Sequence, residues 1–202
     1  MNAAGTGSKL VINSGEFNGQ EAAIMAFDGG EVEINGGTFE TIDNFVVGTN
    51  GSAGRGSNII RVNGGTLTGN ITSNGYEACG IYAANNDTIV VGSDVVINVH
   101  NGCGILMRGG AVTVKSGAKI NITTDKPEGF TGWVGDNKTK MTQSGIIYHE
   151  SANYPGKAGM NLTVENGVTI NAIDHSIEVL SNEAEPAVTI GKGQYNPAYP
   201  EV

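Results

Sequence analysis

The chain has 202 residues and a formal net charge of −9 at pH 7, and its 11 Lys and Arg residues are scattered. Phosphate recognition needs clustered basic side chains, so this charge argues against a nucleic-acid partner and against an anionic membrane surface. No apolar stretch of about 18 residues occurs, and the first residues lack the basic and apolar regions of a signal peptide. We therefore expect a fragment without its own signal peptide.

A short phrase recurs along the whole chain: alternating apolar residues, a turn of Asn, Gly or Ser, then another apolar residue. Its seven copies lie at residues 10–17, 32–39, 60–67, 89–96, 112–120, 162–170 and 188–195. Alternation with period two predicts β-strands. Self-similarity of this kind is typical of proteins built from stacked coils.

A second alternating run lies between these phrases, at residues 23–27, 45–47, 80–83, 104–107, 145–148 and 176–179. Each repeat then carries three short strands, and each strand should pair with its equivalent one repeat along, at about 4.8 Å. We predict an all-β fold, a single-stranded right-handed parallel β-helix (a solenoid) of about seven coils that forms one domain over residues 1–202. Right-handed crossover is the general rule for parallel strands.

The repeats also predict the core and a change of coil shape. Inward positions should be filled by Leu10, Ile12, Val32, Ile34, Ile60, Val62, Val112, Val114, Leu162, Val164, Val188 and Ile190. When the repeats are aligned on their turn residues, Asp94 stands opposite Gly65. The apolar residue that follows the turn is then Phe17, Phe39 or Leu67 in the first three repeats. In three later repeats it is Ile97, Ile120 or Ile170, one position further from the turn, so the coil cross-section should change near residue 90.

Asparagines and cysteines recur in register. We interpret one set as turn residues that adopt the left-handed conformation and bond the neighbouring turn, namely Asn13, Asn35 and Asn63, with a second set at Asn98, Asn121 and Asn171. Cys79 and Cys103 occupy matching phrases and should stack on adjacent coils. A disulfide between them is geometrically possible, and two stacked thiols are the alternative.

Catalytic and metal-binding patterns are weak. The seven aspartates do not stack in the repeat register, and Asp87 and Asp94, which could share one side of the coil with Glu77, are interpreted as solvated turn carboxylates. The three histidines show no zinc-ligand spacing. We therefore predict no catalytic residues, no metal and no cofactor.

The repeat is interrupted by an inserted loop region at residues 124–160. Long loops in an economical repeat are usually functional. Aromatic faces beside polar side chains suit sugar binding, so the candidate ligand-binding residues are Phe130, Trp133, Asp136, Asn137, Lys138 and Tyr154. The alternative is a loop that covers a sheet or packs on another subunit, with Trp133 as its plug.

Three phrases, at residues 103–114, 132–138 and 154–156, resemble the β-helical repeats of phage head-fibre-like proteins and related surface proteins of gut bacteria, which share the pectin-lyase-like fold. The resemblance covers roughly residues 75 to 195. It implies a non-enzymatic module on a virion surface or on an extracellular or cell surface that contacts a host-surface glycan or protein. A polysaccharide lyase or hydrolase of the same fold, and a bacterial adhesin or structural spacer that could be a homotrimer, remain alternatives.

Overall fold

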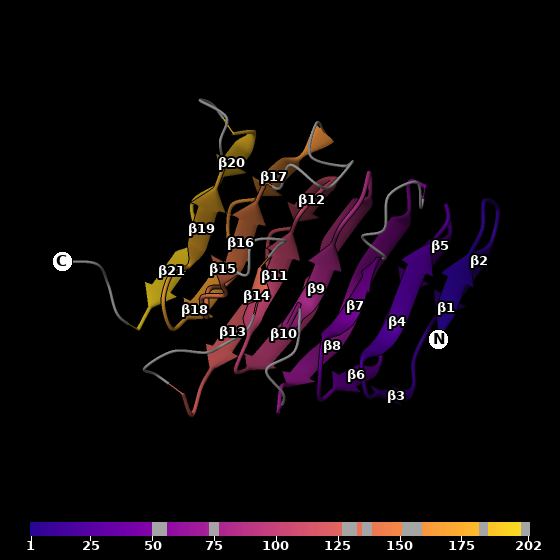
Figure 1. Ribbon diagram of the computed structural model, residues 1–202, viewed down its shortest axis with the longest axis horizontal. Helices are drawn as coiled ribbons and strands as arrows, with labels where there is room; N and C mark the ends of the chain where they lie inside the picture. The colour runs from indigo at the N-terminus through magenta and orange to yellow at the C-terminus, as the bar shows by residue number, and fades with distance from the viewer. Residues whose placement is uncertain are drawn as a thin grey trace.

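The computed structural model describes residues 1–49, 56–72, 77–126, 141–150, 159–181 and 186–198, and the backbone of 133–134 and 139–140. Almost all of the regular structure in this part of the chain is β-strand (Figure 1). Parallel pairing builds two large sheets, one of seven strands and one of twelve. The all-β class and the parallel arrangement predicted from the period-two pattern are confirmed.

The seven-stranded sheet, here called sheet A, contains the second of the two predicted runs. Its strands, in spatial order, are β1 (Asn2–Ala4), β4 (Ala22–Phe27), β7 (Phe45–Thr49), β9 (Cys79–Ala83), β11 (Cys103–Met107), β16 (Ile146–His149) and β19 (Ile177–Leu180). All but β1 correspond to a predicted run. Strand β1 was not predicted because three residues are too few to show alternation.

The twelve-stranded sheet, sheet B, contains the recurring phrase itself, which supplies two strands per repeat. The strands before the turn are β2 (Lys9–Ile12), β5 (Glu31–Ile34), β8 (Ile59–Asn70), β10 (Thr88–His100), β12 (Ala111–Val114), β17 (Asn161–Val164) and β20 (Val188–Ile190). Those after the turn are β3 (Glu16–Gly19), β6 (Thr38–Thr41), β13 (Lys119–Thr123), β18 (Thr169–Ala172) and β21 (Gln194–Pro197). The long strands β8 and β10 run through the turn and join both sets.

The chain visits sheet A, then the two halves of sheet B, in the same order from one end to the other (Figure 1). A register shift interrupts this regularity between Val91 and Asp94, where β10 has one more residue than β8. This bulge is the physical cause of the predicted change near residue 90. It also corrects the alignment of the turns, because Asp94 lies opposite Gly64 and not opposite Gly65.

The core lies between the two sheets and contains the predicted inward residues, with one exception. Ile190 is 49% exposed, although its pattern places it inside. Strand β20 is the last strand on its path in sheet B, so no further strand of the described chain pairs beyond it. Ile12, on the strand β2 at the other end of this path, is only 5% exposed, so the open edge exposes an inward position at one end of sheet B and not at the other.

Glycines in sheet A allow close approach to the second half of sheet B. A Cβ atom on Gly104 would lie 2.3 Å from Cγ2 of Ile120 and 2.4 Å from the carbonyl oxygen of Gly145. Gly80 and Gly145 have the same relation to Ile97 and Ile170, whose Cγ2 atoms would be 2.4 and 2.1 Å away. The isoleucine side chains therefore occupy the space that a side chain on sheet A would need.

Candidate functional site

The predicted loop site lies almost wholly outside the described residues. Phe130, Asp136, Asn137, Lys138 and Tyr154 belong to segments that the structure does not describe. Only the backbone of Trp133 is described: it begins strand β14 (Trp133–Val134), which pairs in antiparallel fashion with β15 (Thr139–Lys140). Ligand binding by these six residues stays a prediction.

Four asparagines form a hydrogen-bonded row on the outer side of sheet B. The Nδ2 atom of Asn121 donates to Oδ1 of Asn98 at 3.0 Å, that of Asn171 to Asn121 at 2.8 Å, and that of Asn196 to Asn171 at 2.9 Å. They lie in register on β10, β13, β18 and β21 and alternate with more deeply buried residues, so their amides face outward. We call these four residues the asparagine ladder.

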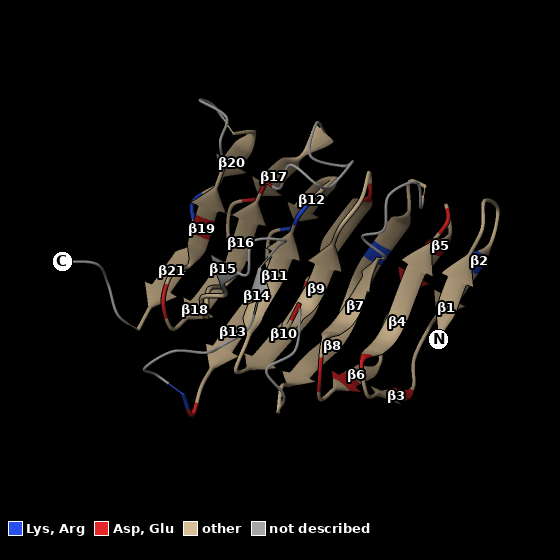
Figure 2. Cartoon of the chain, in the orientation of Figure 1, with Lys and Arg blue, Asp and Glu red and all other residues tan. Residues whose placement is uncertain are grey.

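The ladder keeps hydrogen-bonding capacity for a ligand. An asparagine side chain has two N–H groups and an oxygen with two lone pairs. The bonds along the ladder use one N–H and one lone pair of each inner residue, Asn121 and Asn171. The arrows of β18 and β21 carry no charged residue (Figure 2). On the other two strands Lys119 lies two residues before Asn121, and His100, two residues after Asn98, lies 3.8 Å from the carboxylate of Asp125.

The reason why asparagines recur differs from the predicted one. The described non-glycine residues with positive φ are Asp28, Glu77 and Asn101, so none of the recurring asparagines is left-handed. Those of the asparagine ladder lie within strands, not in turns. Asn13, Asn35 and Asn63 form a second, shorter ladder, with bonds of 3.0 and 2.8 Å. Side-chain stacking along the repeat, and not backbone conformation, explains both sets.

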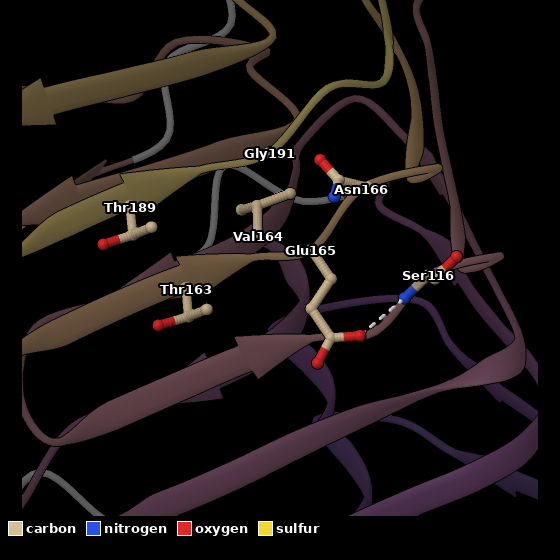
Figure 3. A pocket seen from close by; sticks show the side chains of 7 residues that line it. All are labelled: Ser116, Thr163, Val164, Glu165, Asn166, Thr189 and Gly191. Atoms are coloured by element: carbon tan, nitrogen blue, oxygen red, sulfur yellow. Dashed lines mark hydrogen bonds between the residues drawn. The ribbon is translucent and has the colours of Figure 1, made fainter.

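A shallow groove of about 530 Å³ lies where β12, β17 and β20 end (Figure 3). Its lining residues are Ser116, Thr163, Val164, Glu165, Asn166, Thr189 and Gly191. The Glu165 carboxylate accepts hydrogen bonds from Lys115 Nζ at 2.6 Å and from the Ser116 N–H at 3.2 Å. The hydrogen bond from Lys115, with a smaller effect of the Ser116 N–H, lowers the pKa of Glu165. The carboxylate at the groove thus holds a neighbouring turn in place.

Asp87 is buried, which corrects its interpretation as a solvated turn residue. It is 2% exposed and accepts five hydrogen bonds. The donors are Oγ1 of Thr49 at 2.6 Å, N and Nδ2 of Asn58 at 3.2 and 2.8 Å, and the N–H groups of Ala84 and Asn85 at 3.2 and 2.8 Å. Asp94 is exposed, so these two aspartates do not form a pair. Asp87 connects the ends of successive strands and has a structural role.

Glu77 is the ionisable residue whose surroundings most resemble those of a catalytic acid. Burial raises the pKa of its carboxyl, while a hydrogen bond with Tyr82 and the charge of Arg108 act in the opposite direction. Its φ of 61° is a backbone conformation that non-glycine residues rarely adopt. Tyr82 and Arg108, however, are only 1% and 3% exposed, so a polymer in solution does not reach them in this conformation.

Cys79 and Cys103 lie opposite each other on β9 and β11, as predicted, and both are unoxidised and buried. Burial, and then the hydrogen bond with Cys103, raise the pKa of the Cys79 thiol. The thiolate is the reactive form of cysteine, so this environment disfavours reaction. The pair therefore packs as two small apolar side chains.

The described residues offer neither a metal site nor a membrane-spanning helix. That part of the chain contains no group of three or more His, Cys, Asp and Glu side chains able to hold a metal ion. It also contains no helix of the length and apolar character needed to cross a membrane. Comparison of the chain with models of protein families, with curated proteins and with solved structures finds no match.

Proposed function

We propose that this chain is a single-stranded right-handed parallel β-helix of about seven coils that acts as a non-enzymatic, glycan-binding module of a surface appendage. Parallel pairing of equivalent strands, repeat after repeat, supports the β-helix. The handedness follows the general rule for parallel crossovers. The asparagine ladder carries the binding function, because it presents spare amide donors and acceptors in register over four strands.

The setting of this module is a virion surface or an extracellular or cell surface. The resemblance to phage head-fibre-like repeats supports a phage appendage, and a bacterial adhesin is the second possibility. The partner is a host-surface glycan or protein. The predicted loop residues around Trp133 are a second contact region, unless that loop instead packs in a homotrimer.

A glycan array tests the function and separates the two contact regions. We expect the wild type to bind, the double variant Asn121→Ala/Asn171→Ala to lose most of the signal, and Asn35→Ala in the shorter ladder to keep it. Loss of signal with Trp133→Ala alone would assign binding to the loop region. An array that stays blank for the wild type contradicts glycan binding and favours a structural spacer, and the mass of the protein in solution then decides whether that spacer is a trimer.

A polysaccharide lyase or hydrolase is the alternative that Glu77 favours, because a carboxyl with a raised pKa near a tyrosine and an arginine suits acid–base chemistry. Incubation with a panel of acidic and neutral polysaccharides, followed by measurement of new reducing ends, tests it. Products that disappear with Glu77→Gln would replace the binding proposal by an enzymatic one.

A further inference from the structure

The spacing of the asparagine ladder selects among glycans. Its amides follow one another at the distance between neighbouring strands, about 4.8 Å, because each lies directly opposite the next in the parallel sheet. In an extended glycan with β-1,4 linkages, each sugar ring advances the chain by nearly the same distance. Resting on the proposed function, we propose that the ladder binds a linear, uncharged, β-1,4-linked glycan that lies along it, with one sugar per amide.

The hydrogen-bonding pattern fits such a ligand. A sugar hydroxyl both donates and accepts, and the inner residues Asn121 and Asn171 each keep one N–H and one lone pair beyond the ladder bonds. The three ladder bonds all run in the same direction, from a donor on the later strand to an acceptor on the earlier one. Equivalent amides are therefore repeated at every strand. Successive rings of an extended β-1,4-linked chain are turned over, so each amide meets one ring edge, alternately the C2/C3 hydroxyls and the C6 hydroxymethyl side.

The neighbouring side chains favour an uncharged polymer. The column that precedes the ladder on the same face contains Val96, Lys119, Thr169 and Gln194, of which one is charged. A polymer with a carboxylate on every sugar needs a matching row of basic groups, and this column does not provide one. Thr169 and Gln194 instead add a hydroxyl and an amide beside the track.

The shape of the face separates glycans by linkage. The ladder runs straight across strands that pair in register, so the surface suits a flat, extended ribbon. A chain of α-1,4-linked glucose has the same atoms but coils, so its successive rings cannot all meet the amides. Discrimination between these two linkages is thus the most direct consequence of the proposal.

Calorimetric titration with oligosaccharides of known length tests the inference without any variant. The probes are β-1,4-linked oligomers of glucose and of N-acetylglucosamine, from the dimer to the hexamer, with maltohexaose as the control of matched length. We expect the affinity to rise with length until the four amides of the ladder are covered, then to level off, and we expect maltohexaose not to bind. Salt should change the affinity little, because the contacts involve no ion pairs.

Variants assign the binding to the ladder. Asn121→Ala and Asn171→Ala should each weaken binding of the longer oligomers by about five- to tenfold, the effect of losing one or two hydrogen bonds. Asn35→Ala, in the shorter ladder, should bind as the wild type does. Failure of both β-1,4 series to bind, or equal binding of maltohexaose, overturns the inference. The proposed function survives that result only if the array shows another glycan as a ligand.

Discussion

Removal of the Asp87 carboxylate should destabilise the protein strongly. The side chain accepts five hydrogen bonds and is 2% exposed, so Asp87→Ala leaves several buried donors without an acceptor. Each such donor costs about 1–3 kcal/mol, and the costs overlap because the groups share one site. We expect a loss of about 3–5 kcal/mol, a large part of the roughly 5–15 kcal/mol that stabilises a typical domain.

The conservative variant Asp87→Asn should not restore stability. Three donors meet Oδ2 and two meet Oδ1, so either orientation of an amide places its NH₂ group against donors. Urea unfolding followed by far-UV circular dichroism measures the free energy of unfolding of both variants. An m-value close to that of the wild type shows that the variants unfold in a comparable transition. Asp94→Ala is the matched control, since this exposed aspartate lies in β10, the strand that begins directly after Asp87, and should change stability by less than about 0.5 kcal/mol. Wild-type stability of Asp87→Ala would refute the structural role.

Two further perturbations test the packing and the ionisation described above. Gly104→Ala forces a Cβ atom to within 2.4 Å of a backbone carbonyl, so it should cost about 2–3 kcal/mol in thermal unfolding. Gly159→Ala, which has no atom within 4 Å of the added Cβ, serves as the control, and equal melting temperatures would contradict the close approach of the sheets. Burial raises the pKa of Glu77, so the wild type is favoured by this carboxyl only while it is protonated and loses stability as the pH rises. Glu77→Gln has no such group, so it should become more stable relative to the wild type between about pH 4 and about pH 7. Urea unfolding measures the free energy of unfolding of both proteins. If their difference stays constant with pH, burial does not raise the pKa of the Glu77 carboxyl.

The asparagine ladder shows how far a sequence pattern leads toward a site. The recurrence of Asn98, Asn121 and Asn171 was visible in the sequence, and their alignment across strands is as predicted. Their placement on an outward strand position was not, because the pattern was interpreted through turn chemistry. Asn196 was missed as a member, although it stands one residue after Tyr195, which pairs with Ile170.

Asp87 shows what the repeat could not reveal. Its nearest partners in sequence, Ala84 and Asn85, gave no sign of burial, and Thr49 and Asn58 lie 38 and 29 residues away. Whether a polar side chain at a strand end is solvated depends on which other ends converge there. That convergence depends on the coil cross-section, which local alternation does not describe.

The period-two alternation and its repetition alone determined that the chain is all-β, which residues alternate inward, and which strands pair. They could do so because an equivalent strand one repeat along is the nearest available partner, so register follows from the repeat itself. Only the tertiary structure decided that Ile190 is exposed, that Asp87 is buried, and that the amides of the asparagine ladder face solvent in an unbroken row. Burial depends on what lies above, below and across from a residue, and those neighbours come together only when the two sheets pack.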